Sequence, residues 1–189
     1  MLSVHALPLR GYNRVRVQKR KKVRVDFREF HRLLSQKPAL SADDRAFGAK
    51  FLKDIFGKDT IGAVIRAHLY VESTLNQLIE ECLFRPKAMN VVELSFRFKV
   101  PLAAALGIIP EDFQPPLKQL NALRNKLAHR LDAEISNSDL ERLFHSFAQD
   151  DRDAMTGDKQ LQNILAYMHG CLHGQLNRVR QANSEKEKR

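Results

Sequence analysis

Apolar residues recur every three or four positions along most of the chain, which is the spacing of one face of an α-helix. The longest such run covers residues 59–84. Shorter runs cover residues 26–36, 42–57, 111–131, 135–149 and 158–181. Residues 90–110 predict one or two shorter helices, with a break near Pro101 and an end at Gly107. Strands do not alternate with helices and no internal repeat is present, so the pattern predicts an all-α bundle of about six or seven helices.

Capping signals support several of these helices. Ser41 is placed to cap the run that begins at Ala42, and acidic residues follow in its first turn, where the helix dipole favours them. Prolines fall near the first turn of the run 111–131, and a Ser or Asn cap opens the run 135–149. The run 59–84 carries an apolar stripe made of Ile61, Val64, Ile65, Leu69, Leu75, Leu78, Ile79 and Leu83.

The basic charge of the protein is concentrated at its N-terminus. Residues 1–25 contain no Asp or Glu and carry most of the formal net charge of +10. Their central run, RVRVQKRKKVRV, alternates Val with Arg at both ends, which predicts a short β-ribbon or a segment that is disordered until bound. Such an arm attracts polyanions, most often nucleic acid, through counterion release, although a solubility tail is the alternative. Its candidate nucleic-acid contacts are Arg14, Arg16, Lys19, Arg20, Lys21, Lys22 and Arg24.

The only predicted domain boundary follows this arm. We expect an arm at 1–25, a helical domain at 26–182 and a polar tail at 183–189. Two cysteines, Cys82 and Cys171, are too few for a disulfide framework, and both fall in helical runs where a free Cys acts as a small apolar group. No apolar run approaches the roughly 18 residues that span a bilayer. We therefore expect a reducing, cytoplasmic location and no membrane partner.

One stretch carries candidate chemistry. QLNALRNKLAHRLD, residues 119–132, places Arg124, Asn125 and His129 within six positions of an otherwise apolar, helical run. This Arg-Asn-x-x-x-His pattern near the end of a helix resembles the mark of the HEPN superfamily of small all-helical proteins. The chain before it is similar to the mannitol operon repressor family, with the matching parts Arg97-Phe98-Lys99, ALGII and LKQLNALRNKLAH.

The likeness covers about residues 60–135 and includes an acidic helix, RAHLYVESTLNQLI, in which Glu72 is the acid. Glu72 is thus a candidate catalytic-site residue with Arg124, Asn125 and His129, where it would orient the site, or else it would only neutralise Arg124. Some HEPN proteins are metal-independent endoribonucleases that act as dimers, often as toxins or defence effectors, and others are inactive scaffolds or regulators. The resemblance thus implies a homodimeric RNA-binding or RNA-cleaving effector without metal or cofactor, with a protein partner such as an antitoxin. The alternative is a non-catalytic transcriptional regulator that binds protein, or binds DNA through the arm. Fold resemblance alone does not choose between them.

The residue types fit RNA cleavage. A His suits proton transfer from the 2′-hydroxyl, and the planar, fixed charge of an Arg suits the phosphate. On a regular helix Asn125 and His129 lie about 40° apart, but Arg124 and His129 lie about 140° apart. They would converge within one chain only if the helix loosened near Ala128, whereas a two-fold dimer would bring two motifs to one cleft. Lys126 and Arg130 are further candidate nucleic-acid contacts.

A structural role is the competing interpretation of the same residues. Arg124 would then pair with Glu72 inside the bundle, His129 would bond the last carbonyls of its helix, and Asn125 would fix the neighbouring loop. His68 and Glu72, four residues apart, would form a simple side-chain pair. His169 and His173 share a helix face with Cys171 between them, but no third ligand lies nearby, so no metal site is expected.

Overall fold

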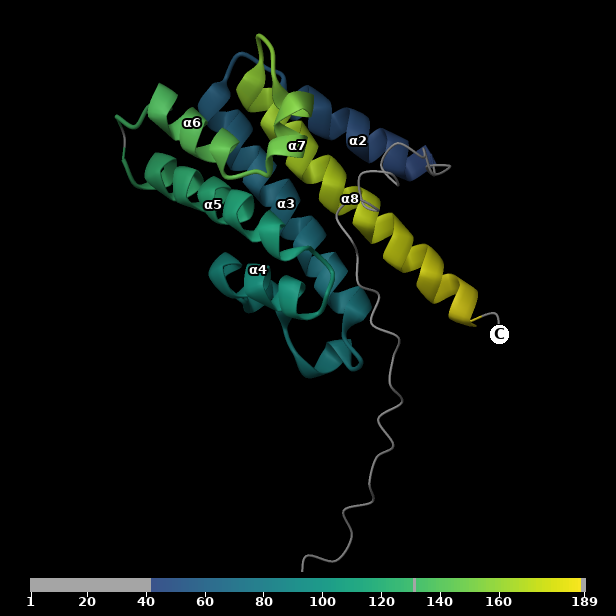
Figure 1. The fold of residues 1–189 in the computed structure, drawn as a ribbon. Coiled ribbons are helices and arrows are strands. Elements are labelled where there is room, and N and C mark those ends of the chain that lie inside the picture. The colour runs from purple at the N-terminus through teal and green to yellow at the C-terminus, as the bar shows by residue number, and fades with distance from the viewer. Residues whose placement is uncertain (1–41, 131, 188–189) are drawn as a thin grey trace, which may run out of the picture.

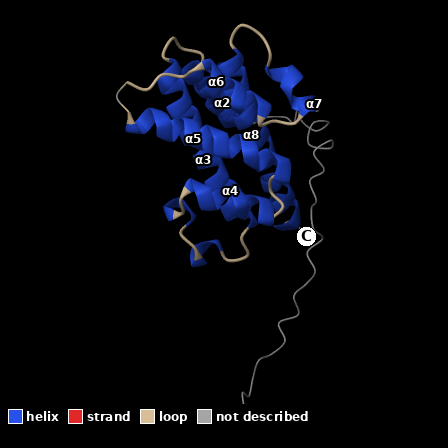
Figure 2. Ribbon diagram, turned by 60° about the vertical axis from the view of Figure 1, so that its left-hand side comes forward, coloured by secondary structure: helices blue, strands red, loops and turns tan. Residues whose placement is uncertain are grey.

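The computed structural model describes residues 42–130 and 132–187, and these residues form an all-α fold, as the apolar pattern predicts (Figure 1). No strand occurs among them (Figure 2). The α-helices are α2 (Ala42–Ile55), α3 (Thr60–Cys82), α4 (Phe96–Ala105), α5 (Gln114–His129), α6 (Asn137–His145), α7 (Gln149–Arg152) and α8 (Gln160–Glu187). Short 3-10 turns are η1 (Pro86–Ala88), η2 (Val91–Glu93), η3 (Glu111–Phe113) and η4 (Asp153–Met155). The predicted arm, the helix at 26–36 and the cap at Ser41 lie outside the described residues.

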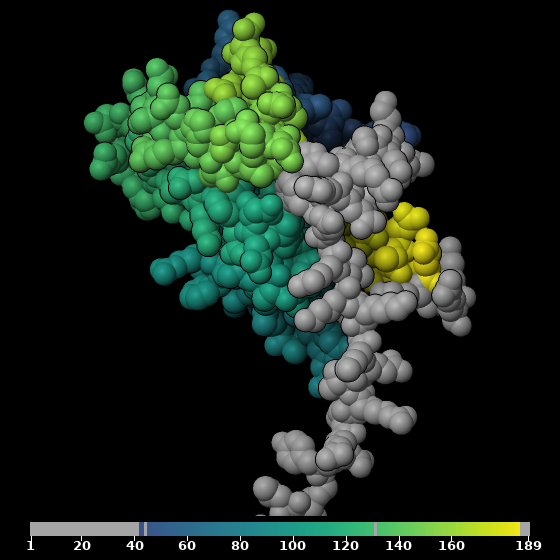
Figure 3. Space-filling view, viewed as in Figure 1, coloured from purple at the N-terminus to yellow at the C-terminus, as the bar shows by residue number. Residues whose placement is uncertain are grey.

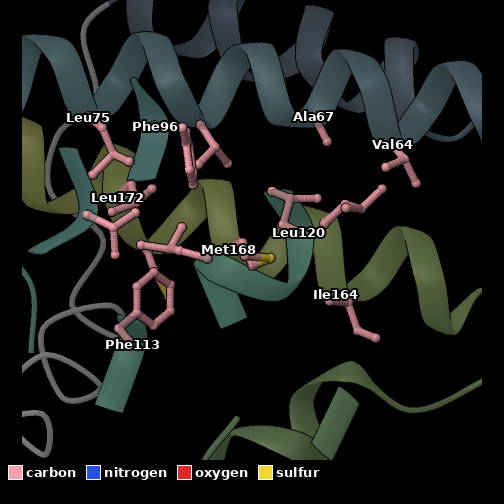
Figure 4. Packing of buried hydrophobic residues seen from close by; sticks show 14 of the residues in the cluster. Val64, Ala67, Leu75, Phe96, Phe113, Leu120, Ile164, Met168 and Leu172 are labelled. Carbon is pink, nitrogen blue, oxygen red and sulfur yellow. The ribbon is translucent and has the colours of Figure 1, made fainter. Parts of the chain in front are cut away.

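Helix α3 is the centre of the bundle, because α2, α4, α5 and α8 all pack against it (Figure 1). Its inner side chains Val64, Ala67 and Leu75 point toward residues of α5 and α8 (Figure 4). Facing them are Leu120 of α5 and Ile164, Met168 and Leu172 of α8, all of which are buried. Each large apolar side chain that is buried in this way contributes about 1.5–3 kcal/mol.

The apolar stripe of α3 is only partly correct as a prediction of its buried face. The Asp59 side chain caps the helix by accepting a hydrogen bond from the Gly62 amide at 2.7 Å. Val64, Leu75, Leu78 and Ile79 are buried as expected, but Ile61 and Leu69 are exposed. The neighbouring helices lie on the side of His68, and Leu69 is about 100° further around α3. The buried face therefore includes a histidine, which the apolar pattern does not reveal.

Helix α4 corrects the prediction of a break near Pro101, since the helix runs through this proline. Buried Phe96, Val100 and Ala103 anchor α4 against α3 and α5, and this packing outweighs the missing proline N–H. The predicted end at Gly107 is confirmed, because its φ of 72° closes the helix. The Gly107 amide bonds Ala104 O and the Ile108 amide bonds Ala103 O, both at 2.9 Å, which is a Schellman motif.

Helix α8 is longer than its apolar pattern predicts. It continues beyond Gln181 to Glu187, so most of the predicted polar tail is helical. The extension is held by contacts with α3: Arg180 Nη2 donates to Gln77 Oε1 at 2.7 Å, and Asn183 Nδ2 donates to Glu81 O at 3.2 Å. These are polar contacts, which apolar periodicity does not record. Among the described helices, none has the length and apolar character needed to cross a membrane.

Candidate functional site

Helix α5 holds the Arg-Asn-x-x-x-His motif at its C-terminal end. The helix begins with prolines in its first turn, as predicted, and is anchored by one buried side. The buried residues of that side are Pro116, Leu117, Leu120, Leu123 and Leu127. Arg124 and Asn125 are half-buried beside this anchor, whereas His129 is the last residue of the helix and is exposed. The core thus fixes the helix while leaving the motif at the surface.

Arg124 is not paired with Glu72, which corrects the structural interpretation of the motif. Its Nη1 donates to Asn125 Oδ1 at 2.8 Å, and no ion pair joins it to a carboxylate of the described residues. The amide of Asn125 is neutral, so it orients the guanidinium without cancelling its charge.

Glu72 is occupied by Lys99 instead. Lys99 Nζ lies 2.6 Å from Glu72 Oε1 and also donates to Val92 O at 3.3 Å. The Lys99 side chain is 1% exposed and the Glu72 side chain is 25% exposed, so the carboxylate neutralises a charge that water scarcely reaches. Removing one partner of such a pair is strongly destabilising. Glu72 therefore has a structural partner, and it is separate from the guanidinium of Arg124.

His68 extends this buried network to α5. Its Nε2 lies 3.1 Å from Asn121 Oδ1, and its Nδ1 lies 3.8 Å from Glu72 Oε2, which confirms the expected His68–Glu72 pair. Burial lowers the pKa of His68, while the Asn121 hydrogen bond and the Glu72 charge oppose that shift. The positive charges of Arg124 and Lys99 lower the pKa further. The positive charge of Arg124 on α5 therefore acts on His68 of α3 across the interface between these two helices.

His129 lies on a different side of α5 from Arg124. Helix α5 stays regular through Ala128, so the loosening that would bring Arg124 and His129 together within one chain does not occur. The His129 side chain makes no hydrogen bond, ion pair or ring contact with another described residue, and its expected bond to the last carbonyls of the helix is not formed. A single chain therefore presents the Arg and the His of the motif separately.

Lys126 is used within the fold. Its Nζ donates to Glu134 O at 2.9 Å and to Asp139 Oδ2 at 2.6 Å. Asp139 also forms a capping box with Ser136, which confirms the predicted cap of α6. Burial alone would raise the pKa of Asp139, but hydrogen bonds from Lys126 and Ser136 outweigh it and hold the pKa well below its ordinary value. This geometry ties α5 to α6 and leaves the Lys126 charge neutralised.

Arg130 follows α5 as its C-cap and is exposed, so its side chain stays accessible beside His129. The arm candidates Arg14, Arg16, Lys19, Arg20, Lys21, Lys22 and Arg24 lie outside the described residues. The roles of Lys99 and Asn121 within the network were missed by sequence reasoning. Asn121 falls one helical turn before Asn125, a spacing that places both on neighbouring parts of one helix face.

The second histidine pair lies in an aromatic cluster. His169 and His173 stack with ring centroids 5.6 Å apart, and His169 lies 4.1 Å from the ring of Phe51. Burial, with the charge of His173, lowers the pKa of His169 to about 4. Within the described residues, no group of three or more His, Cys, Asp or Glu side chains is arranged to hold a metal ion. Cys171 is buried, which raises the pKa of its thiol, and Cys82 is half-buried; neither forms a disulfide.

Comparisons of this chain with protein-family models, with curated proteins and with solved structures found no match.

Proposed function

We propose that this protein is a HEPN-like RNA-binding protein that cleaves RNA without a metal, as a homodimer. The observation that supports this proposal is that Arg124 bonds a neutral amide and does not pair with Glu72. A motif that served only the fold would use Arg124 to neutralise Glu72, but that carboxylate pairs with Lys99. Arg124 bonds the neutral Asn125 instead and keeps its positive charge at a half-exposed position. A guanidinium held in this way is suited to a phosphate group.

The motif residues supply the groups that this reaction needs. His129 would accept the proton of the 2′-hydroxyl, whose oxygen then attacks the adjacent phosphorus. The new 2′-oxygen–phosphorus bond forms as the 5′-oxygen–phosphorus bond breaks, and the 5′-oxygen takes up a proton. Arg124 would stabilise the charge that builds on the phosphate, and Asn125 would orient Arg124. Because the nucleophile belongs to the substrate, RNA is favoured over DNA.

A homodimer accounts for the separation of the motif residues. Arg124 and His129 do not meet on one copy of α5, because the helix remains regular to its end. A two-fold axis beside α5 would bring the Arg124 of one copy toward the His129 of the other, so that two chains share one phosphate. In this arrangement, Arg130 adds positive charge at the same helix end, and the basic arm gathers RNA from solution.

The experiment that tests this proposal is cleavage of labelled RNA in EDTA by the wild-type protein and by His129→Ala. His145→Ala is a matched control, since His145 is likewise an exposed histidine that ends a helix, in this case α6. We expect cleavage by the wild type and the control, and a loss of about 100-fold or more in His129→Ala, the scale of general acid–base catalysis. Circular dichroism should be unchanged in all three. Equal cleavage by His129→Ala and the wild type would exclude His129 as the general base and would overturn the proposed HEPN-like mechanism.

A second candidate function is a non-catalytic transcriptional regulator that binds a protein, or binds DNA through the basic arm. It is favoured by one observation, which is that the Arg and His of one chain do not converge. This candidate predicts that the wild type leaves RNA intact in EDTA and that deletion of residues 1–25 weakens DNA binding and its salt dependence. DNA binding that is unchanged by the deletion would show that the arm is not the segment that binds DNA.

A further inference from the structure

The exposed apolar side chains are concentrated at one end of the bundle. Eight large hydrophobic residues of the described chain are exposed, and five of them fall between residues 84 and 106. These five are Phe84, Met89, Val92, Phe98 and Leu106. This segment is the connection from α3 to α4 and α4 itself, which form the lower end of the described molecule in Figure 1 and Figure 3. Such a concentration marks an interaction surface.

The same segment contains two similar tetrads, Phe84-Arg85-Pro86-Lys87 and Phe96-Arg97-Phe98-Lys99. In the first tetrad Phe84 is 79% exposed, and the Arg85 guanidinium lies 6.0 Å from the centre of its ring. In the second tetrad Phe96 is buried as an anchor, while Phe98 is 64% exposed next to exposed Arg97. Each tetrad thus presents one aromatic ring beside one arginine.

The fold fixes the second tetrad at this end. Lys99 Nζ donates to Val92 O, which joins the connection before α4 to α4 itself. Phe96 packs against the ring of His68, with centroids 4.5 Å apart, so the second tetrad is fixed to α3. Phe98 therefore projects from a helix whose opposite side is anchored. A ring that is already held in place loses little conformational freedom when it stacks on a ligand.

The side-chain charges of the two tetrads themselves are all positive. Arg85, Lys87 and Arg97 are exposed, whereas Glu93 is the sole acidic residue of the segment 84–106. An apolar surface for a second copy of the chain would repel itself through these like charges. Aromatic rings interleaved with cations are the arrangement that binds single-stranded nucleic acid, where bases stack on the rings and phosphates meet the cations.

We propose that the surface formed by the two tetrads, around Phe84 and Phe98, binds single-stranded RNA. This inference rests on the proposed function and names the form of RNA that the protein takes. Phe98 and Phe84 each stack on a base, and Arg97, Arg85 and Lys87 contact the phosphates between them. Since duplex RNA keeps its bases stacked on one another, the surface selects unpaired RNA.

The test is binding of a labelled single strand whose 2′-hydroxyls are methylated, so that no cleavage accompanies binding. The full chain is compared with Phe98→Ala, Phe98→Tyr and the control Leu52→Ala, which removes an exposed apolar side chain from α2. Loss of one stacking ring weakens binding about 5- to 150-fold. We expect that loss in Phe98→Ala, while Phe98→Tyr and Leu52→Ala bind as the wild type does.

Salt dependence separates stacking from phosphate contact. Arg97→Ala should lower the slope of log affinity against log salt by about 0.7, the value for one phosphate contact on a single strand. Lys53→Ala, which removes an exposed charge from α2, should leave the slope unchanged, and so should Phe98→Ala.

Three outcomes would overturn this inference. If the wild type binds the strand and Arg124→Ala weakens binding, but Phe98→Ala binds normally, the surface is not the RNA site and the proposed function stands. If Phe98→Ala instead turns a dimer into a monomer in sedimentation, the surface is a subunit interface. Failure of the wild type to bind at all would remove the proposed function as well.

Discussion

The region where α4 and α5 pack against α3 contains two sets of polar residues with opposite properties. Two side chains of the inner set, His68 and Lys99, are buried, and the Lys99 charge is matched within the fold by Glu72. The inner set consists of His68, Glu72, Lys99 and Asn121. The outer set lies at the end of α5, where a guanidinium bonds only a neutral amide and a histidine faces solvent. It consists of Arg124, Asn125 and His129.

This difference separates residues that hold the fold from residues that remain available for a ligand. Burying a charge requires a partner, and Glu72 supplies that partner for Lys99. Arg124 has the same charge, but its partner is neutral, so an anion from outside would complete its environment. If the comparison is correct, changes in the inner set lower stability, and changes in the outer set leave stability nearly unaltered.

The largest effect on stability is expected from Glu72→Gln. This change leaves the Lys99 ammonium, 1% exposed, beside a neutral amide, and breaking such a pair costs about 3–5 kcal/mol. Lys99→Met should cost less, because the remaining Glu72 carboxylate is 25% exposed and still reaches water. Urea unfolding of both variants would measure the two losses.

The double variant Glu72→Gln with Lys99→Met provides the control for this pair. Since it removes both charges together, it should be more stable than Glu72→Gln alone. A double variant whose loss equals the sum of the two single losses would show that the Glu72–Lys99 pair contributes no coupling, and the inner set would then not act as a unit.

The pH dependence of stability should distinguish the buried His169 from the exposed His129. The pKa of His169 is lowered to about 4, so the unfolded chain binds a proton there more readily than the folded protein does. Its contribution to stability is complete above the ordinary histidine pKa of about 6.5 and is lost as the pH falls toward 4. His169→Phe, which places a neutral ring among Phe51, Phe47 and Tyr70, should remove about 2–3 kcal/mol of this acid-induced loss.

Measuring the free energy of unfolding from pH 7 to pH 4 would check that prediction. His129→Ala is the matched control, since His129 is exposed and has no partner among the described residues. Its stability should fall with pH in parallel with the wild type. If His169→Phe also ran parallel to the wild type, the acid sensitivity would have to come from other groups, such as His68.

The sequence predicts the helices much better than it predicts the partners of polar side chains. Apolar spacing locates α3, α5 and α6, and local signals mark the starts of α5 and α6, because the first-turn prolines and Ser136 act within a few residues of each helix start. The sequence predicts a helix break at Pro101, but α4 continues through this residue. The packing that retains the helix comes from distant parts of the chain, so the local pattern does not show it. Local helix signals can therefore be predicted from the sequence, whereas tertiary packing cannot.

The candidate site shows the same division. The motif and its placement at the end of a helix follow from the letters Arg124, Asn125 and His129. The partner of Glu72 does not, because Lys99 and Arg124 are both basic and both distant from it in the sequence. Only the packing of α4 on α3 decides which cation reaches the carboxylate. That choice is what separates the inner set from the outer one.

The smallest effect on stability is expected from the outer set itself. Arg124→Ala removes one hydrogen bond to the adjacent Asn125, and His129→Ala removes an exposed ring, so each should change the free energy of unfolding by about 0.5 kcal/mol or less. Lys126→Ala, on the same helix, should cost about 1–2 kcal/mol, because it removes the hydrogen bond that joins α5 to Asp139 at the start of α6 and leaves Arg142 as the cation of that carboxylate. Thermal or urea unfolding of the three variants would rank them. A loss above 2 kcal/mol in Arg124→Ala would place Arg124 in the inner set and make the motif a structural element, whereas near-wild-type stability combined with lost RNA binding would make it a ligand site.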